Sequence, residues 1–301
     1  LEGVNVQHIF QENSSHPDDF FDRYLNDLLK AKQDPNLDLK TLLQEKEKEV
    51  LLKISECIND PREKVSAKRK GILVLTTLAT QGAVDLLLNS LASLGNQPLR
   101  LELIRALNKI RAKGERREFS PWIIKKEVIG EVRIYKSILT ALKEYKQRKL
   151  VSKPDEDYLL ATLQAIQEES LERIFRLLGL LYDSDIVHII YDRLAELDLN
   201  KHVKANALEL LQNVLEPELC RALYPVLDDA QWVEMRKKSL EEVVREFFES
   251  QDQWLVICAI FMVVELRLDH FRSQLEGMGH SQIPVIREAA EIALLKTVLK
   301  K

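Results

Sequence analysis

The sequence predicts an all-α protein: an α–α superhelix, or solenoid, of stacked antiparallel helix pairs, with a pair of longer helices in the middle. Three observations predict this fold. Glycine and proline are few, with nine of each in 301 residues, and aromatic residues make up only 6%, which disfavours an all-β protein. Apolar residues recur at helical spacing along most of the chain. One short helical pattern is also repeated, which is typical of proteins that present a long surface rather than enclose a catalytic pocket.

The repeated pattern consists of an apolar residue, a basic residue, small residues within the next three positions, and further apolar residues. Two clear copies begin at Val203 and Ile286, a looser copy begins at Leu99, and a copy that begins at Leu255 has no basic residue. The step from Leu255 to Ile286 is 31 positions, and the step from Ala67 to Leu99 is 32. Both steps suit a repeat of two helices joined by short turns.

The residue types in this pattern have a structural explanation, because two helices cannot bury their apolar faces alone and neighbouring pairs must stack. Small residues are expected where helices cross closely, at Ala207, Ala259, Ala290 and Ala293. Basic residues are expected to pair with a turn aspartate of the adjacent repeat, at Arg100, Lys204 and Arg287. Hydrogen bonds to unpaired first-turn amides are expected from Asp60 and Asn200.

In the first third of the chain, helices are expected over 17–33, 39–58, 61–79, 84–94 and on to 112. Asn59 and Asp60 indicate a helix cap, because Pro61 follows them at a first helical position. Gly82 marks a turn, and so does the pair Gly95-Asn96.

The middle of the chain differs from the repeat. A polar loop runs from Lys113 to Pro121, and two long helices are expected over 122–149 and 156–182. The remaining helices are expected over 186–197, 203–215, 217–227, 232–248, 254–266, 268–275 and 284–299. This pattern divides the chain into an N-terminal array over 1–112, a long-helix pair over 113–182 that joins the arrays, and a C-terminal array over 183–301.

The repeated pattern resembles HEAT repeats, a member of the armadillo-like class of α solenoids. The copy that begins at Leu255 departs from the HEAT signature because Val256 stands at the basic position, and residues 113–182 do not fit the repeat. The resemblance implies a solenoid that binds other proteins.

A narrower resemblance covers residues 156–301. The segments 171–182 and 205–219 are similar to segments in the soluble part of certain bacterial transporters, which have an ATP/ADP-carrier-like or major-facilitator-like membrane domain followed by HEAT repeats. This resemblance implies that the chain is a cytosolic tail cut from a longer protein, and a sequence that begins at Leu1 rather than Met agrees with it. It supplies no catalytic residue.

Composition and cysteine usage suit a globular protein. At 46% hydrophobic and 31% charged residues the chain can bury a core, and its net charge is only −4. The three cysteines, Cys57, Cys220 and Cys258, lie far apart in apolar helical contexts and are expected to be buried free thiols in a reducing compartment.

The first twenty residues show no signal peptide, and the most apolar run, over 254–266, is shorter than the ~20 residues that cross a bilayer.

No catalytic constellation is apparent. The six histidines show no pair at zinc-ligand spacing and no neighbouring cysteine, and Gly277-Met278-Gly279 has no preceding strand that would make it a dinucleotide fingerprint. There is no phosphate-binding loop and no nucleophile elbow. We therefore predict a non-enzymatic protein with no catalytic residue, no metal ligand and no cofactor.

One segment has an unusual charge. Between Arg100 and Lys153 there are 16 Lys and Arg against 6 Asp and Glu, a net charge of +10, whereas the rest of the chain carries −14. Such a basic segment can bind phospholipid headgroups, nucleic acid or an acidic protein surface. Alternatively, its side chains can pair with acidic neighbours within the solenoid. The residues predicted to bind an anionic partner are Lys109, Arg111, Lys113, Arg116, Arg117, Lys125 and Lys126.

The predicted function is a scaffold or regulatory module that binds a protein partner or a membrane domain of the same polypeptide. The expected location is the cytoplasm, with a tether to the inner face of a membrane through an upstream segment and with the basic segment facing the anionic surface. The alternative is a HEAT-like nucleic-acid-binding protein of the DNA-glycosylase type, with the basic segment on the DNA and with Trp122 and Tyr145 inside it. A third hypothesis is an accessory factor for the assembly of an enzyme or cofactor complex.

Overall fold

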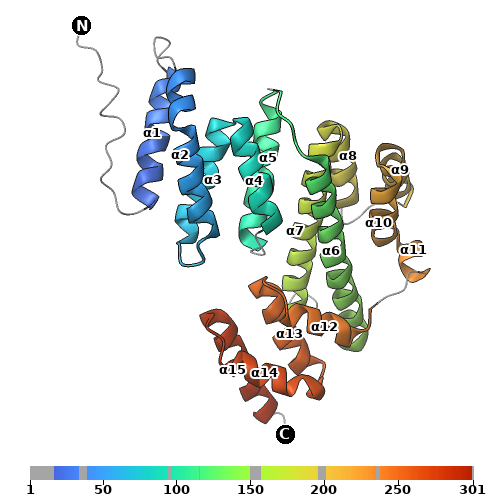
Figure 1. Cartoon of the computed structure of the whole chain (residues 1–301). Coiled ribbons are helices and arrows are strands. Elements are labelled where there is room, and N and C mark those ends of the chain that lie inside the picture. Colours follow the sequence, from blue (N-terminus) through green and yellow to red (C-terminus); the bar gives the residue numbers. More distant parts are fainter. Residues whose placement is uncertain are drawn as a thin grey trace. The chain divides into compact units, whose positions relative to one another are not determined.

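The computed structural model describes residues 17–33, 39–93, 97–114, 116–149, 157–195, 201–234 and 238–299, and every regular element in these ranges is a helix (Figure 1). The predicted all-α class is therefore confirmed. The chain forms two compact units, and the boundary between them falls inside helix α6, after Ile124. None of the helices in the described ranges is long and apolar enough to cross a membrane.

Unit 1 contains α1 (Pro17–Gln33), α2 (Leu39–Asn59), α3 (Val65–Leu78), α4 (Gln81–Ser93), α5 (Gln97–Ala112) and the first residues of α6. Here α1 packs against α3 and α2 packs against α4, so alternate helices lie side by side. Two polar contacts recur at the same sequence separation of 33 residues: Thr80 donates to Glu47, and Arg69 binds Glu102 at 2.7 Å. Both contacts join helices that are two elements apart in the chain, or the residue just before such a helix.

Glycine permits close packing between helices of unit 1. A Cβ atom on Gly71 would lie 3.1 Å from Ile54 Cγ2, and one on Gly82 would lie 2.7 Å from Leu51 Cδ1. The prediction of a turn at Gly82 is wrong, because Gly82 lies in the first turn of α4. The chain turns instead at Ala79, whose φ of 53° is left-handed.

The predicted helix start at Pro61 is also wrong. Helix α2 ends at Asn59, and α3 begins only at Val65. The Asp60 carboxylate accepts a hydrogen bond from the Arg62 amide at 2.9 Å, which stabilises a turn between the helices rather than a cap of α3. The second predicted cap, Asn200, lies outside the described residues, as does the turn at Gly95-Asn96.

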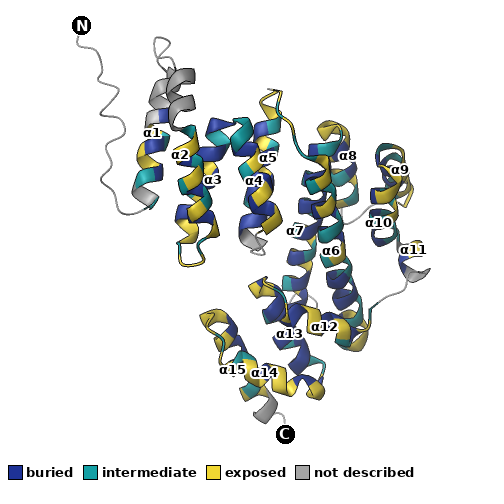
Figure 2. Cartoon of the chain, viewed as in Figure 1, coloured by how far each residue is buried: buried dark blue, intermediate teal, exposed yellow. Residues whose placement is uncertain are grey.

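Unit 2 contains the rest of α6 (Pro121–Lys149) and the helices after it. These are α7 (Tyr158–Leu181), α8 (Ser184–Ala195), α9 (Lys201–Val214), α10 (Pro217–Leu227), α11 (Asp229–Glu234), α12 (Leu240–Phe248), α13 (Gln253–Glu265), the 3₁₀-helix η3 (Asp269–Phe271), α14 (Arg272–Met278) and α15 (Pro284–Leu299). Helices α7 to α10 pack in sequence order, and α13 packs against α7, α12 and α15. The core joins α6 and α7 to α12–α15, and α13 is buried on most sides (Figure 2).

The predicted single helix over 232–248 is two helices in the structure. Helix α11 ends at Glu234 and α12 begins at Leu240. The Ser239 hydroxyl accepts from the Glu242 amide at 3.1 Å, and the Glu242 carboxylate accepts from the Ser239 amide at 2.7 Å. This reciprocal capping box starts a new helix where apolar periodicity alone suggested continuity.

Most copies of the repeated pattern begin at a buried residue, but Val203 is only half-buried. Leu255 and Ile286 are buried in the neighbouring helices α13 and α15, and Ala67 and Leu99 are fully buried in α3 and α5. The four small residues expected at close crossings are also fully buried: Ala207, Ala259, Ala290 and, in the last turns of α15, Ala293.

Two of the three basic residues of the pattern, Arg100 and Arg287, bind backbone carbonyls rather than the expected turn aspartates. Arg100 is buried and donates to the Leu91 carbonyl at 2.9 Å, and Arg287 donates to the Ser281 carbonyl at 3.1 Å. Carbonyls in the last turn of a helix lack intrahelical partners, so a guanidinium beside α4 satisfies one of them. All three cysteines are free, with Cys57 and Cys258 buried and Cys220 only half-buried.

Candidate functional site

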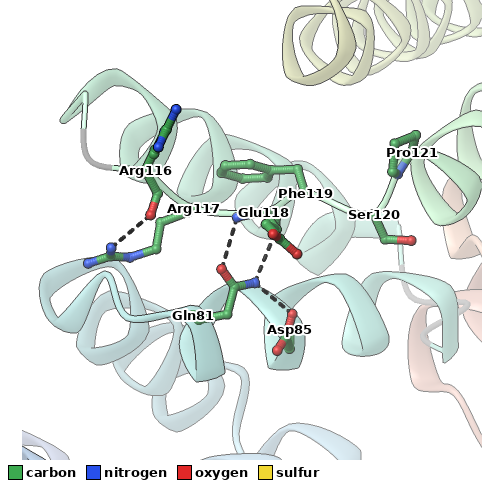
Figure 3. A pocket seen from close by; sticks show the side chains of 8 residues that line it. All are labelled: Gln81, Asp85, Arg116, Arg117, Glu118, Phe119, Ser120 and Pro121. Atoms are coloured by element: carbon green, nitrogen blue, oxygen red, sulfur yellow. Dashed lines mark hydrogen bonds between the residues drawn. The ribbon is translucent and has the colours of Figure 1, made fainter.

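A pocket of about 830 Å³ in unit 1 brings together two of the predicted basic residues (Figure 3). Gln81 and Asp85 of α4 line it, and the other lining residues form the segment from Arg116 to Pro121, just before and at the start of α6. Arg116 and Arg117 point in different directions from this segment, and the Phe119 ring lies between them and Pro121 (Figure 3).

The Gln81 side chain holds this segment in place. Its Oε1 accepts from the Glu118 amide at 2.9 Å, and its Nε2 donates to the Glu118 carbonyl at 2.9 Å. The same Nε2 donates to Asp85 Oδ1 at 2.9 Å. One primary amide thus satisfies both backbone groups of Glu118, which fixes the wall of the pocket against the N-terminal end of α4.

Two of the predicted anion-binding residues also bind backbone carbonyls of unit 1. Lys113 Nζ donates to the Thr76 carbonyl at 2.6 Å, and Arg117 Nε donates to the Ala79 carbonyl at 2.8 Å. Both carbonyls lie at the C-terminal end of α3, where cations complement unpaired carbonyls and the helix dipole. Part of each side chain's bonding capacity is therefore used within the fold.

The other predicted residues of unit 1 differ in exposure. Lys109 and Arg116 are exposed, whereas Arg111 is half-buried. Trp122, which follows the pocket residue Pro121, is 71% exposed. Arg116 is therefore an exposed cation that lines the pocket together with the half-buried Phe119 ring, whereas Lys109 is exposed but does not line the pocket.

Lys125 and Lys126 belong to unit 2, because the unit boundary falls between Ile124 and Lys125. Lys125 binds Glu216 at 2.5 Å, and this hydrogen bond raises the pKa of Lys125 above its usual value. Lys126 is exposed.

Much of the positive charge further along α6 is also paired within unit 2. Lys143 lies 4.8 Å from the centre of the buried Trp232 ring, Arg148 binds Glu144 at 3.3 Å, and Lys149 binds Asp157 at 3.1 Å and Glu265 at 3.2 Å. Burial lowers the pKa of Lys149, but hydrogen bonds to Tyr145 and the two carboxylates raise it more. These groups stabilise the packing of α6.

Tyr145, one of the four aromatic residues between Arg100 and Lys153, is fully buried and donates to Asp157 at 2.9 Å. Burial raises the pKa of Tyr145 to about 12. Its ring is therefore closed to a nucleic-acid base in this fold, whereas the Trp122 ring is open.

The pocket residues Gln81, Asp85 and Phe119 were not predicted from the sequence. Gln81 and Glu118 are 37 positions apart, and no motif links them. The one usable signal was the break of helical periodicity over 113–121, which located the loop but not its partner.

The lining of the pocket mixes both signs of charge with an aromatic ring. It combines guanidinium groups, the carboxylates of Asp85 and Glu118, and an aromatic ring. No group of three or more His, Cys, Asp or Glu suited to a metal ion occurs in the described ranges. Comparisons with protein-family models, curated proteins and solved structures found no match for this chain.

Proposed function

We propose that this protein is a non-enzymatic, HEAT-like helical-repeat scaffold that binds a protein partner through the pocket of unit 1. The packing of α1 on α3 and of α2 on α4, with polar contacts that recur 33 residues apart, carries the proposal. Stacked helix pairs of this kind display side chains along a continuous surface, which suits the recognition of another macromolecule.

The charges of the pocket favour a protein over a polyanion. Asp85 and Glu118 line it beside Arg116, and carboxylates would repel a nucleic-acid backbone there. The Phe119 ring adds apolar contact area of the kind that anchors protein interfaces. In unit 2, Lys125 and Lys149 are paired with carboxylates, which reduces the charge that DNA or a lipid surface would meet.

A site-specific crosslinking experiment tests the partner class. A photo-reactive phenylalanine analogue replaces Phe119 in the pocket, and a matched control carries it at Leu52, which is 60% exposed on α2 of the same unit. We expect the Phe119 probe to crosslink a discrete polypeptide in cells, and Arg116→Glu to abolish the product. Equal products from both probes, or crosslinks to nucleic acid alone, would contradict the proposal.

Charge reversal distinguishes the alternatives. Lys109→Glu with Arg116→Glu reverses two exposed charges of the predicted anion-binding set, of which Arg116 lines the pocket. Lys48→Glu with Lys64→Glu makes the same charge change at exposed positions elsewhere in unit 1. We expect the first pair alone to weaken binding of the crosslinked polypeptide by about tenfold or more. If the wild type instead binds duplex DNA or anionic vesicles, with a steep salt dependence that the first pair removes, the nucleic-acid or membrane alternative replaces this proposal.

The cytosolic-tail hypothesis is a narrower version of the same proposal. It names the partner as a membrane domain of the same polypeptide and rests on the sequence resemblance of residues 156–301 to transporter tails. Apolar runs of ~20 residues encoded upstream of Leu1 would support it, and their absence from the full gene product would remove it.

A further inference from the structure

A buried ion pair joins α6 to α7 in unit 2. Glu131 of α6 is 0% exposed and Arg173 of α7 is 1% exposed. Arg173 Nε donates to Glu131 Oε2 at 3.0 Å, and its Nη1 donates to Glu169 Oε1, one turn earlier on α7, at 2.8 Å. Two of the three guanidinium nitrogens therefore have carboxylate partners.

The third nitrogen and a neighbouring hydroxyl remain unsatisfied. Arg173 Nη2 and Ser170 Oγ are both buried and have no hydrogen-bond partner within the described part of the chain. Ser170 lies three positions before Arg173, so both residues lie on one face of α7. Buried polar atoms are nearly always satisfied, by protein or by ordered water.

A buried acidic residue caps α13, a helix that packs against α7. Asp252 is 5% exposed and caps α13, because its Oδ1 accepts from the Trp254 amide at 2.9 Å. Helix α13 packs against α7. Burial raises the pKa of Asp252, and the positive charge of Arg173 acts in the opposite direction. The salt bridges of Arg173 nevertheless go to Glu131 and Glu169.

We propose that Arg173 Nη2, Ser170 Oγ and the Asp252 carboxylate form a binding site for one internal water molecule. The water oxygen accepts from Nη2, one water hydrogen is donated to Asp252, and the Ser170 hydroxyl completes the set. Three hydrogen bonds are typical of a buried water in a protein. The water bridges the Arg173 guanidinium and the carboxylate that caps α13, and so links that helix to α7 and, through Glu131, to α6.

The site makes the cap of α13 depend on α7. If the water is lost, Asp252 has one hydrogen bond fewer to hold its carboxylate at the Trp254 amide. The first-turn amides of α13 should then open to solvent more often, while the interior of α7 stays protected. This inference is independent of the proposed function, because no residue of the unit 1 pocket takes part.

Two measurements on the full-length chain test the site. In a crystal structure at about 1.8 Å resolution or better, we expect water density within hydrogen-bond distance of Arg173 Nη2 and the Asp252 carboxylate. A direct contact between Arg173 Nη2 and any protein acceptor, or an empty site beside other well-ordered buried waters, would overturn the proposal.

The second measurement is amide hydrogen exchange in two matched serine variants. Ser170→Ala removes one ligand of the water, and Ser90→Ala removes a hydroxyl of unit 1 that is also buried and unsatisfied but has no role in this site. We expect Ser170→Ala to speed exchange of the Trp254 amide by about fivefold, the effect of one lost hydrogen bond, and Ser90→Ala to leave it unchanged. The same exchange rate in both variants would contradict the site.

Discussion

At the residue scale, two aspartates of unit 2 cap helices in opposite electrostatic settings. Asp157 accepts from the Leu160 amide at the start of α7, and its carboxylate also binds Lys149 and Tyr145. Burial alone would raise the pKa of Asp157, but these hydrogen bonds together lower it. Asp252 caps α13, and burial raises its pKa despite the charge of Arg173. The ionised form of Asp157 therefore stabilises the folded state, whereas the ionised form of Asp252 destabilises it.

Replacing each aspartate by asparagine keeps the cap and removes the charge. Asp157→Asn should lower the free energy of unfolding by about 1 kcal/mol near neutral pH. The folded-state pKa of Asp157 lies below its unfolded value, so the loss is complete above the unfolded pKa and disappears as pH falls through the folded one. Urea unfolding from pH 2 to pH 7 measures it, and a loss that persists unchanged at the acid end would contradict the assignment.

Asp252→Asn should have the opposite sign and raise the free energy of unfolding at neutral pH by about 1 kcal/mol. Its folded-state pKa is raised, so the wild type loses stability as pH rises from the unfolded pKa through the folded one, and the variant does not. The same urea titration provides the measurement. A variant that is less stable than the wild type near neutral pH would show that Arg173 outweighs burial.

The Glu131–Arg173 pair is the second residue-scale feature with a large expected effect. Arg173→Met leaves the fully buried Glu131 without its guanidinium and should cost about 3–5 kcal/mol. The double variant Glu131→Met with Arg173→Met should recover much of this loss, because no uncompensated charge remains. Thermal and urea unfolding complete the double-mutant cycle, and strictly additive losses would indicate that the pair is not coupled.

At the element scale, short capping sequences determine where a run of residues with helical apolar periodicity is divided into two helices. Ser239 and Glu242 cap each other at the start of α12, and they separate α12 from α11. Ser239→Ala should cost about 1 kcal/mol, the typical value for an N-cap serine. Ser66→Ala, at an exposed position inside α3, is the control and should be neutral or slightly stabilising. Equal effects of the two changes on urea unfolding would contradict the capping role.

In unit 1, the Gln81 side chain has a comparable effect on local structure, because it holds the backbone of Glu118. Gln81→Met keeps the length of the side chain and removes all three hydrogen bonds to Glu118 and Asp85. The Glu118 amide should lose most of its protection from hydrogen exchange, because its acceptor is the Gln81 oxygen. If protection at Glu118 is retained, another acceptor holds the pocket wall.

At the scale of the whole molecule, acidic residues of unit 2 mask part of the positive charge that the sequence concentrates in one segment. Lys125 is bound by Glu216, 91 positions away in sequence. Glu216→Gln should therefore strengthen retention on heparin and steepen its salt dependence by about one released counterion. Glu209→Gln, an exposed carboxylate of the same unit, provides the same charge change as a control. Equal retention of the two variants would show that the pair does not mask Lys125.

The sequence alone determined the helical class and many helix positions, because these depend on local chemistry. The bounds of α10 and α15 were predicted to the residue, since each begins with proline at a first helical position and then follows helical periodicity. The residue types at Gly82 and Asp60 led to wrong predictions. Gly82 lies in a helix that packs closely against Leu51, and Asp60 forms a turn with Arg62 rather than a helix cap.

Only the tertiary structure decided which charged side chains are open to a partner. Arg116, Arg117 and Lys125 lie within ten positions in the sequence, yet one is exposed, one binds the end of α3 and one binds Glu216. Their partners lie 38 and 91 positions away, beyond the reach of any local pattern. The pair of Glu131 and Arg173 could not be predicted from local sequence either, because the two side chains become buried and paired only when α6 and α7 pack together.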